Sequence, residues 1–193
     1  MRLDNEFEVP APVEQVWRYL LDVPRMAPNL PGTELNEVVD ENTYKGHLAA
    51  KLGPVSMRFA GVARILERDE AAHRIVIKAE GAEATGKGQA SMGLTATLVK
   101  AGSGTKVLVA QDIDISGAAA QFGRGMIGDV TTVLMRTFAQ NVAEDIPRWS
   151  RGEQRSEPAR AASGFSIWWQ ATKTALGRFL GRFFVSRKAR GLT

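Results

Sequence analysis

Strand-like segments dominate the sequence between residues 33 and 115, and short turns separate each segment from the next. The alternation is cleanest in Thr105–Ile115, where Asp112 and Asp114 lie on one side and apolar residues with Gln111 lie on the other. This period of two residues predicts half-buried strands. The expected strands are Thr33–Val39, Thr43–Leu52, Val55–Arg68, His73–Glu80, Thr85–Lys100 and Thr105–Ile115. Because consecutive strands with short connections pair in antiparallel fashion, we expect an antiparallel sheet.

The flanking segments predict one further strand and several helices. Arg2–Val9 alternates like the other strands, whereas Val13–Leu21 carries a helical apolar stripe. Asp22–Gly32 contains three prolines and predicts a short helix or a compact loop. Gly117–Ile146 predicts one long helix, whose four glycines remove side chains and leave space against the sheet. Together these elements predict an α+β protein with the helix-grip fold, in which a curved antiparallel sheet wraps around a long C-terminal helix.

The inward side of the strands and the apolar stripe of the long helix provide a candidate ligand-binding site. The alternative is a filled hydrophobic core without a cavity, and taken individually most of these residues fit that alternative. Their mixture of Gly, Ala and Met favours a cavity, because small residues leave volume and Met adapts to a flexible apolar ligand. The candidates are Met26, Leu30, Leu48, Leu52, Met57, Phe59, Ile77, Met92, Leu94, Val109, Gln111, Phe122, Gly123, Met126, Ile127 and Val130. Val55 and Val133 are expected to face inward as well.

Two features refine this candidate site. Gln111 is the one polar residue predicted on the inner face of a strand, where it either binds a ligand carbonyl or meets water at the rim. Pro24–Gly32, which contains Met26 and Leu30, is either a lid over the cavity or an ordinary connection.

Composition excludes several kinds of chemistry. The chain has no cysteine, so disulfides, thiolate metal sites and cysteine nucleophiles are excluded. Its two histidines, His47 and His73, are expected at the surface and at a turn, and they are too few for a multi-histidine metal site. No nucleophile elbow, P-loop or metal-binding spacing occurs, and nearly all carboxylates fall on outward phases or in turns. We therefore expect no catalytic and no metal-binding residues.

The net charge of +4 conceals an uneven distribution. Residues 1–147 hold 15 Lys and Arg against 19 Asp and Glu, a net of −4, whereas residues 148–193 hold 10 against 2, a net of +8. Residues 148–164 are polar and contain no periodic pattern, which predicts a flexible linker between an acidic domain at 1–147 and a basic tail at 165–193.

The basic tail predicts an amphipathic helix that lies in the membrane interface. One face is rich in bulky apolar residues, and the Trp168–Trp169 pair suits the interfacial preference of indole. Its basic residues suit an anionic leaflet. The candidate membrane-binding residues are Phe165, Trp168, Trp169, Leu176, Phe179, Leu180, Phe183, Lys173, Arg178 and Arg182. Docking on a protein partner or on the chain's own domain is an alternative. Nucleic acid is disfavoured, because the aromatic residues line one face instead of alternating with the basic ones.

We expect no signal peptide, because the charged N-terminus is not followed by an apolar segment. The sequence contains no run of about 18 apolar residues, so we expect no membrane-spanning helix. The expected location is the cytoplasm, with peripheral attachment to the cytoplasmic face of the cell membrane.

Two stretches resemble a known family, namely VPAPVEQVWRYLLDVPRMAPNLPG at residues 9–32 and IDISGAAAQFGRGMIGDVTTVLMRTFAQNV at residues 113–142. They are similar to the CoxG family of carbon monoxide dehydrogenase subunits, which belongs to the START-like, polyketide-cyclase-like (SRPBCC) superfamily. The order of helix, Pro-rich loop, sheet and helix carries the superfamily resemblance. Pro31-Gly32 and Ser116–Ile127 carry the resemblance to CoxG itself.

This resemblance implies a non-catalytic accessory protein of molybdenum carbon monoxide dehydrogenase, associated with attachment of that enzyme to the cytoplasmic membrane. It also implies a deep apolar cavity for a hydrophobic ligand. The family context suggests a respiratory quinone, menaquinone or ubiquinone, as the cargo in electron transfer. The alternative is a cyclase- or hydrolase-like enzyme that acts on an aromatic or polyketide substrate in the same cavity.

Overall fold

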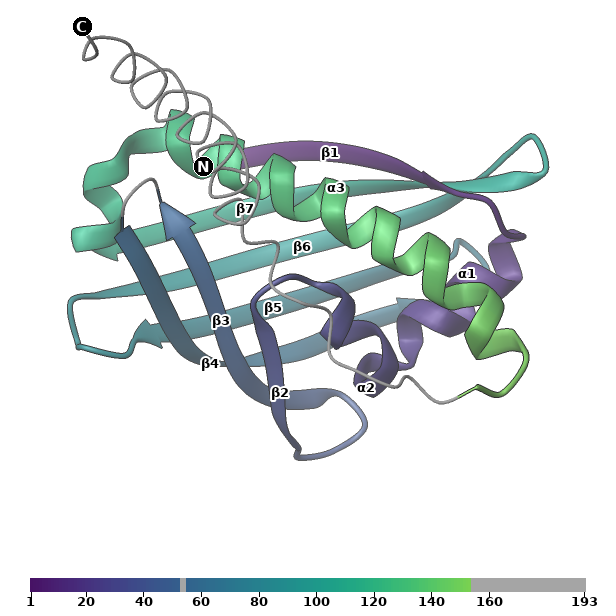
Figure 1. Cartoon of the computed structure of the whole chain (residues 1–193), viewed down its shortest axis with the longest axis horizontal. Helices are drawn as coiled ribbons and strands as arrows, with labels where there is room; N and C mark the ends of the chain where they lie inside the picture. The colour runs from purple at the N-terminus through teal and green to yellow at the C-terminus, as the bar shows by residue number, and fades with distance from the viewer. Residues whose placement is uncertain (53–54, 154–193) are drawn as a thin grey trace, which may run out of the picture. The chain divides into compact units, whose positions relative to one another are not determined.

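The computed structural model describes residues 1–52 and 55–153, and its main feature is a seven-stranded antiparallel sheet (Figure 1). The strands are β1 (Arg2–Val9), β2 (Thr33–Val38), β3 (Thr43–Leu52), β4 (Val55–Asp69), β5 (Arg74–Glu83), β6 (Gly88–Ala101) and β7 (Gly104–Gly117). Their order in the sheet is β1-β7-β6-β5-β4-β3-β2. Sequential strands are therefore neighbours except at β1, which pairs with β7 at the far edge.

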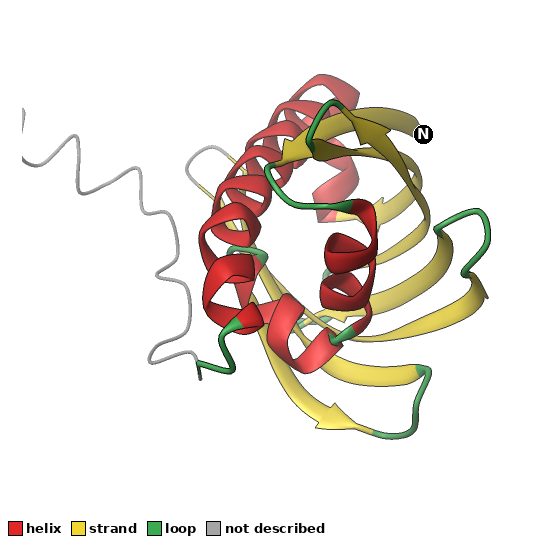
Figure 2. Ribbon diagram, turned by 90° about the vertical axis from the view of Figure 1, so that its right-hand side faces the viewer, coloured by secondary structure: helices red, strands yellow, loops and turns green. Residues whose placement is uncertain are grey.

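The helices lie against the concave side of this sheet, and α3 is the longest. They are α1 (Val13–Leu21), α2 (Val23–Met26), the 3-10 helices η1 (Ala27–Asn29) and η2 (Ala118–Phe122), and α3 (Gly123–Ser150). The 28-residue α3 contacts both β1 and β3, so it closes the curved sheet from one edge region to the other (Figure 2). The helix-grip prediction is confirmed.

The main apolar core occupies the part of the concave face beneath α1. Val16 of α1 is fully buried, and Trp17 is 4% exposed. They belong to one cluster with strand residues such as Ile75, Leu98 and Val107 and with Val142 of α3. The predicted apolar stripe of Val13–Leu21 therefore does what its spacing requires, because it packs the helix onto the sheet.

The predicted long helix differs from the observed one at its start. Residues 118–122 form the 3-10 helix η2, and α3 begins at Gly123. Because a 3-10 turn holds three residues instead of 3.6, a stripe counted continuously from residue 117 is displaced at some positions, although Val130 still packs inward. The inward positions expected for Met126 and Val133 are wrong, since these side chains are 37% and 56% exposed, whereas Ile127 is 9% exposed.

The end of the helix also differs from the prediction. α3 continues through Pro147 to Ser150, three residues into the linker expected from residue 148. Trp149 accounts for this extension, because its ring packs edge-on against Tyr19 at a centroid distance of 5.6 Å and its Nε1 donates to Asp22. These contacts offset the backbone hydrogen bond that a proline removes. The predicted tail helix at 165–193 lies outside the described residues.

Two strand details differ from the prediction as well. The turn between β5 and β6 spans residues 84–87, not 81–84, because the Glu83 carboxylate accepts hydrogen bonds from Thr85 N and Oγ1 and from Lys87 N. Val55, expected to face inward, is 41% exposed.

Candidate ligand-binding site

A band of small residues crosses the middle of the concave face. The antiparallel register sets Gly46 of β3 opposite Gly61 of β4, Gly61 opposite Gly81 of β5, and Gly81 opposite Ala90 of β6. Ala63 and Ala79 form a second pair directly beside this row. The small-residue band thus comprises Gly46, Gly61, Ala63, Ala79, Gly81 and Ala90. No large side chain projects from these positions toward α3, and this leaves room over the centre of the sheet.

The glycines of the small-residue band also permit the curvature of the sheet. A Cβ atom placed on Gly61 would lie 2.3 Å from the carbonyl oxygen of Glu80, and one on Gly46 would lie 2.4 Å from that of Glu34. Neighbouring backbone therefore approaches these positions more closely than any side chain allows. Glycine at such positions is a known cause of sharp bends in sheets. The same residues both bend the sheet and leave its centre free of large side chains.

Apolar side chains around the band are incompletely packed. The main core lies beneath α1, and a separate small cluster forms around Met57 and Ala119, near η2. Leu48, Met92 and Ile113 face inward but belong to neither cluster, and each is half-buried. An inward apolar side chain in the middle of a domain remains partly accessible when there is space beside it. The arrangement therefore favours a cavity between the two clusters.

The predicted site residues divide between these regions. Met57, Phe59, Phe122 and Val130 come together in the cluster beside η2. Ile77, Leu94 and Val109 join the main core, and so do Met26 and Leu30 from the Pro-rich segment. Ile127 is buried. Met126 and Gly123 are exposed and do not line the interior as expected. Of Leu52 the structure describes the backbone, at the end of β3.

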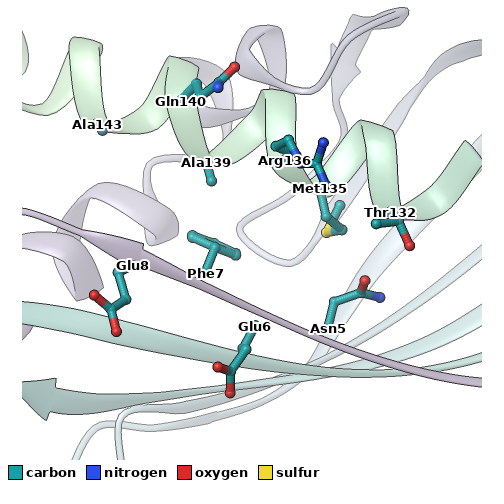
Figure 3. Close-up of a pocket in the computed structure, with 10 residues that line it drawn as sticks. All are labelled: Asn5, Glu6, Phe7, Glu8, Thr132, Met135, Arg136, Ala139, Gln140 and Ala143. Atoms are coloured by element: carbon teal, nitrogen blue, oxygen red, sulfur yellow. The ribbon is translucent and has the colours of Figure 1, made fainter. Parts of the chain in front are cut away.

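A groove of about 340 Å³ lies between the edge strand β1 and helix α3 (Figure 3). Asn5 and Phe7 point from β1 toward the helix, whereas Glu6 and Glu8 point away from it. The helix contributes Thr132, Met135, Arg136, Ala139, Gln140 and Ala143. The volume of this groove lies at the lower end of the range for small-molecule sites, roughly 300–1,000 Å³. Sequence reasoning did not find this groove, because it depends on how α3 lies against β1.

Gln111 of β7 is 3% exposed and faces inward, as predicted. Its Oε1 accepts a hydrogen bond from Asn5 Nδ2 at 3.4 Å, and its Nε2 donates to the Met92 sulfur at 3.8 Å. Both contacts are long, and a thioether is a weak acceptor. Gln111 is not the one polar group on the concave face, since Asn5 also faces inward. Thr33 does so too, and its Oγ1 is buried without a hydrogen-bond partner among the described residues.

A buried polar network fixes α1 and α2 against the C-terminal half of α3. The Arg25 guanidinium donates to both carboxylate oxygens of Asp145, at 2.6 and 2.7 Å. Tyr19 Oη donates to the same carboxylate at 2.6 Å and accepts from Asn29 Nδ2 at 2.6 Å. Asn141 Nδ2 donates to the carbonyl oxygen of Asn29 at 2.8 Å. The Pro-rich segment is therefore held in place at several points.

Burial and the Asp145 carboxylate keep Tyr19 protonated, and the carboxylate also keeps Arg25 charged. Burial, together with the hydrogen bond to Asp145, raises the pKa of Tyr19 above its ordinary value, so the phenol stays neutral. The hydrogen bond to Asp145 raises the pKa of Arg25, so the guanidinium stays charged. Sequence reasoning missed Asp145 because it placed nearly all carboxylates at the surface. The available signal was its spacing, three residues after the buried Val142 on the same helical face.

Little in the described residues suggests reaction chemistry. His73 Nε2 lies 2.9 Å from Glu14 Oε1, but the Glu14 side chain is 72% exposed, so this pair lies at the surface. His47 Nδ1 lies 2.6 Å from Asn36 Oδ1, also at the surface. No group of three or more His, Asp or Glu side chains within residues 1–52 and 55–153 is placed to hold a metal ion. The strongest feature of the interior is its apolar lining.

Solved structures with the same fold define the class of this protein. A conserved protein from Geobacillus kaustophilus aligns with a TM-score of 0.69 at 19% identity, over 77% of this chain and 96% of that one. The Zhui aromatase/cyclase from Streptomyces sp. R1128 aligns with a TM-score of 0.56 at 16% identity, over 80% and 99%. A protein from Thermus thermophilus aligns at 0.55 and 17%, over 75% and 98%. The fold is thus START-like, of the polyketide-cyclase type.

A match to a family model identifies the chain more closely than its fold does. Residues 6–147 match the CoxG family of carbon monoxide dehydrogenase subunits, and the chain belongs to that family. A comparison with curated proteins finds no match. Membership agrees with the resemblance found in the two stretches at residues 9–32 and 113–142. The family match ends at residue 147 and does not include the tail at 165–193.

Proposed function

We propose that this protein is a non-catalytic accessory protein of molybdenum carbon monoxide dehydrogenase that binds a respiratory quinone, menaquinone or ubiquinone, between its sheet and α3. It carries the quinone between the cytoplasmic membrane and the dehydrogenase. The observation that carries the proposal is the small-residue band, which leaves the centre of the concave face open beside incompletely packed apolar side chains.

The chemistry of the cargo supports this proposal. The family name implies association with carbon monoxide dehydrogenase. When the dehydrogenase oxidises carbon monoxide, the released electrons must reach a respiratory chain in the membrane. A quinone could carry them, but it is too apolar to cross water unaided. A protein that encloses the quinone solves this problem without performing any reaction. Met57 and Met92 provide adaptable surfaces for a flexible isoprenoid chain.

Organic extraction of the purified full-length protein, followed by mass analysis, tests the cargo. We expect a co-purified quinone, and we expect the emptied protein to take up menaquinone from phospholipid vesicles. A protein that yields no quinone on extraction and takes none from vesicles would contradict the carrier proposal.

Attachment to the membrane is a separate part of the proposal. No helix in the described part of the chain is long and apolar enough to cross a bilayer. We assign attachment to the basic aromatic tail at 165–193 on the basis of its sequence. Sedimentation with phosphatidylglycerol vesicles should pull down the full chain and not a chain that ends at Gly164. Phosphatidylcholine vesicles should bind the full chain more weakly, because part of the attraction is electrostatic. Equal binding of both chains would overturn this assignment.

A second candidate function is a cyclase-like reaction in the same interior, because the Streptomyces structure with this fold is an aromatase/cyclase. This alternative predicts turnover of an aromatic or polyketide substrate. It also predicts that turnover is lost when an inward polar side chain such as Gln111 is replaced. A bound quinone released unchanged in chemical structure favours the carrier.

A further inference from the structure

We infer that the paired carboxamides of Asn5 and Gln111 recognise a carbonyl oxygen of the bound ligand, and that Gln111 is the donor. This inference rests on the proposed function, because it assigns the polar contact within the same ligand-binding interior. It predicts which part of a quinone the protein recognises, beyond enclosing its apolar body.

The surroundings of Gln111 are almost entirely apolar. Leu3 of β1 and Leu94 of β6 lie directly opposite Gln111 in the register of the sheet. Met92 contributes its sulfur atom. Gln111 is 3% exposed, so water has little access to its side chain. In the described part of the chain, its amide forms hydrogen bonds with the Met92 thioether and with Asn5.

The hydrogen-bonding capacity of Gln111 exceeds what these neighbours provide. A carboxamide offers two N–H donors and one oxygen acceptor. Among the described residues, Nε2 has a sulfur atom at 3.8 Å and no oxygen or nitrogen acceptor. The carbonyl oxygen has Asn5 Nδ2 at 3.4 Å, against a usual distance of about 2.9–3.0 Å. A buried amide with unmet donors destabilises the empty protein, and an apolar side chain would avoid that loss.

The position of Asn5 connects this amide to the groove. Asn5 lines the space between β1 and α3 together with Phe7, Thr132 and Met135 (Figure 3). Because Asn5 Nδ2 engages the oxygen of Gln111, the two Gln111 N–H groups hold most of the unmet hydrogen-bonding capacity. A ligand group that satisfies these N–H donors must be an acceptor. A neutral ring carbonyl in an otherwise apolar ligand meets this requirement, because the immediate surroundings of Gln111 are apolar.

Ligands with and without carbonyl oxygens test the inference. The probes are menaquinone with two isoprenoid units and the oxygen-free hydrocarbon with the same ring system and chain. We expect Gln111→Met to weaken menaquinone binding about five- to tenfold, which corresponds to one hydrogen bond. Binding of the hydrocarbon should be unchanged. The matched control is Gln89→Met, since Gln89 is an exposed glutamine of β6, and it should bind both probes like the parent protein.

Two further measurements separate recognition from packing. Thermal unfolding of the empty protein should show that Gln111→Met is at least as stable as the parent, because it removes an incompletely bonded buried amide. The infrared carbonyl bands of menaquinone on the parent protein should show one carbonyl shifted to lower frequency. That second readout needs no variant to fold.

The outcomes distinguish the two levels of the proposal. If the parent binds both probes equally and its bound menaquinone shows no shifted carbonyl band, the inference is wrong and the carrier proposal stands. If Gln111→Met loses the same factor of affinity for both probes, the inference is also overturned, because a change in packing alone explains that result. If the parent binds neither probe, the carrier proposal fails and the inference fails with it.

Discussion

The Tyr19 hydroxyl donates a hydrogen bond to the Asp145 carboxylate over 2.6 Å, although 126 residues separate them in the chain. Arg25 completes the contact with two further hydrogen bonds to the same carboxylate. The Asp145 side chain is 4% exposed and the Arg25 side chain 13% exposed, so water screens this ion pair only weakly. This contact is one of the points at which the N-terminal helices are fixed to α3.

Asp145→Asn should destabilise the protein by about 3–5 kcal/mol, because it leaves the Arg25 charge buried without its partner. Chemical denaturation measures the change in the free energy of unfolding. Glu144→Gln is the matched control, since Glu144 is exposed on the same helix and its replacement should change stability by less than about 0.5 kcal/mol. An unchanged denaturation midpoint in Asp145→Asn would show that the network contributes nothing.

Tyr19 should make stability fall at alkaline pH. Its pKa is raised in the folded protein by burial, so between the ordinary value near 10 and the raised value only the unfolded chain loses the proton. The unfolded state then binds fewer protons than the folded state, and the free energy of unfolding decreases as pH rises, by up to about 1.4 kcal/mol per unit. At pH 8 and below, Tyr19 adds almost no pH dependence to the free energy of unfolding.

Comparison of the parent with Tyr19→Phe between pH 8 and 11 measures this effect. We expect the variant to be less stable by about 1–2 kcal/mol at pH 8, because it lacks the hydroxyl that bonds to Asp145 and Asn29. The difference should shrink above pH 10. Parallel curves for the two proteins up to pH 11 would mean that Tyr19 is not responsible.

Gly117 and Gly123 bracket η2 and should differ in their tolerance of alanine. Both have positive φ angles, 73° and 72°. A Cβ on Gly117 would lie 2.2 Å from the carbonyl oxygen of Lys87, whereas one on Gly123 would meet no atom within 4 Å. Gly123→Ala should therefore cost about 1–3 kcal/mol from backbone conformation, and Gly117→Ala should cost more. Thermal unfolding that ranks the two variants in the opposite order contradicts this assignment.

Filling the small-residue band should reduce ligand capacity without unfolding the sheet. Ala79→Leu adds a bulky side chain at an inward, half-buried position of β5. Ala82→Leu, at an exposed position of the same strand, adds the same atoms on the other side. We expect the first variant to take up at least several-fold less menaquinone from vesicles, and the second to match the parent. Equal uptake by both would place the ligand elsewhere.

Glu83 should contribute stability that disappears in acid. The hydrogen bond from Thr85 holds the pKa of the Glu83 carboxyl below its ordinary value. The folded state therefore favours the carboxylate, and the stabilisation is present above the ordinary pKa and is lost as pH falls through the lowered one. Glu83→Gln should be less stable than the parent at pH 7, with a difference that narrows toward pH 3. Unfolding curves with a constant difference across this range would contradict it.

Local patterns were sufficient for most of the fold. The predicted ranges of Arg2–Val9, Val13–Leu21 and Thr43–Leu52 agree with the observed β1, α1 and β3. Each has a strong period of its own, 2 or 3.6 residues, that burial on one face imposes. The exact phase of α3 could not be obtained in this way, because a short 3-10 segment precedes the helix, so that Met126 is exposed whereas Val130 packs against the cluster around Met57.

The candidate site followed the same division. Alternation along the strands was enough to predict most inward side chains, including the buried Gln111, because alternation on a pleated strand is a local property; Val55 at the start of β4 is an exception. The tertiary structure alone decided that Gly46, Gly61 and Gly81 align into one band and that Asp145 meets Tyr19 and Arg25. Strand register and helix docking depend on contacts between residues far apart in the chain. Such contacts form only when the whole sheet closes around α3, and so no local period records them.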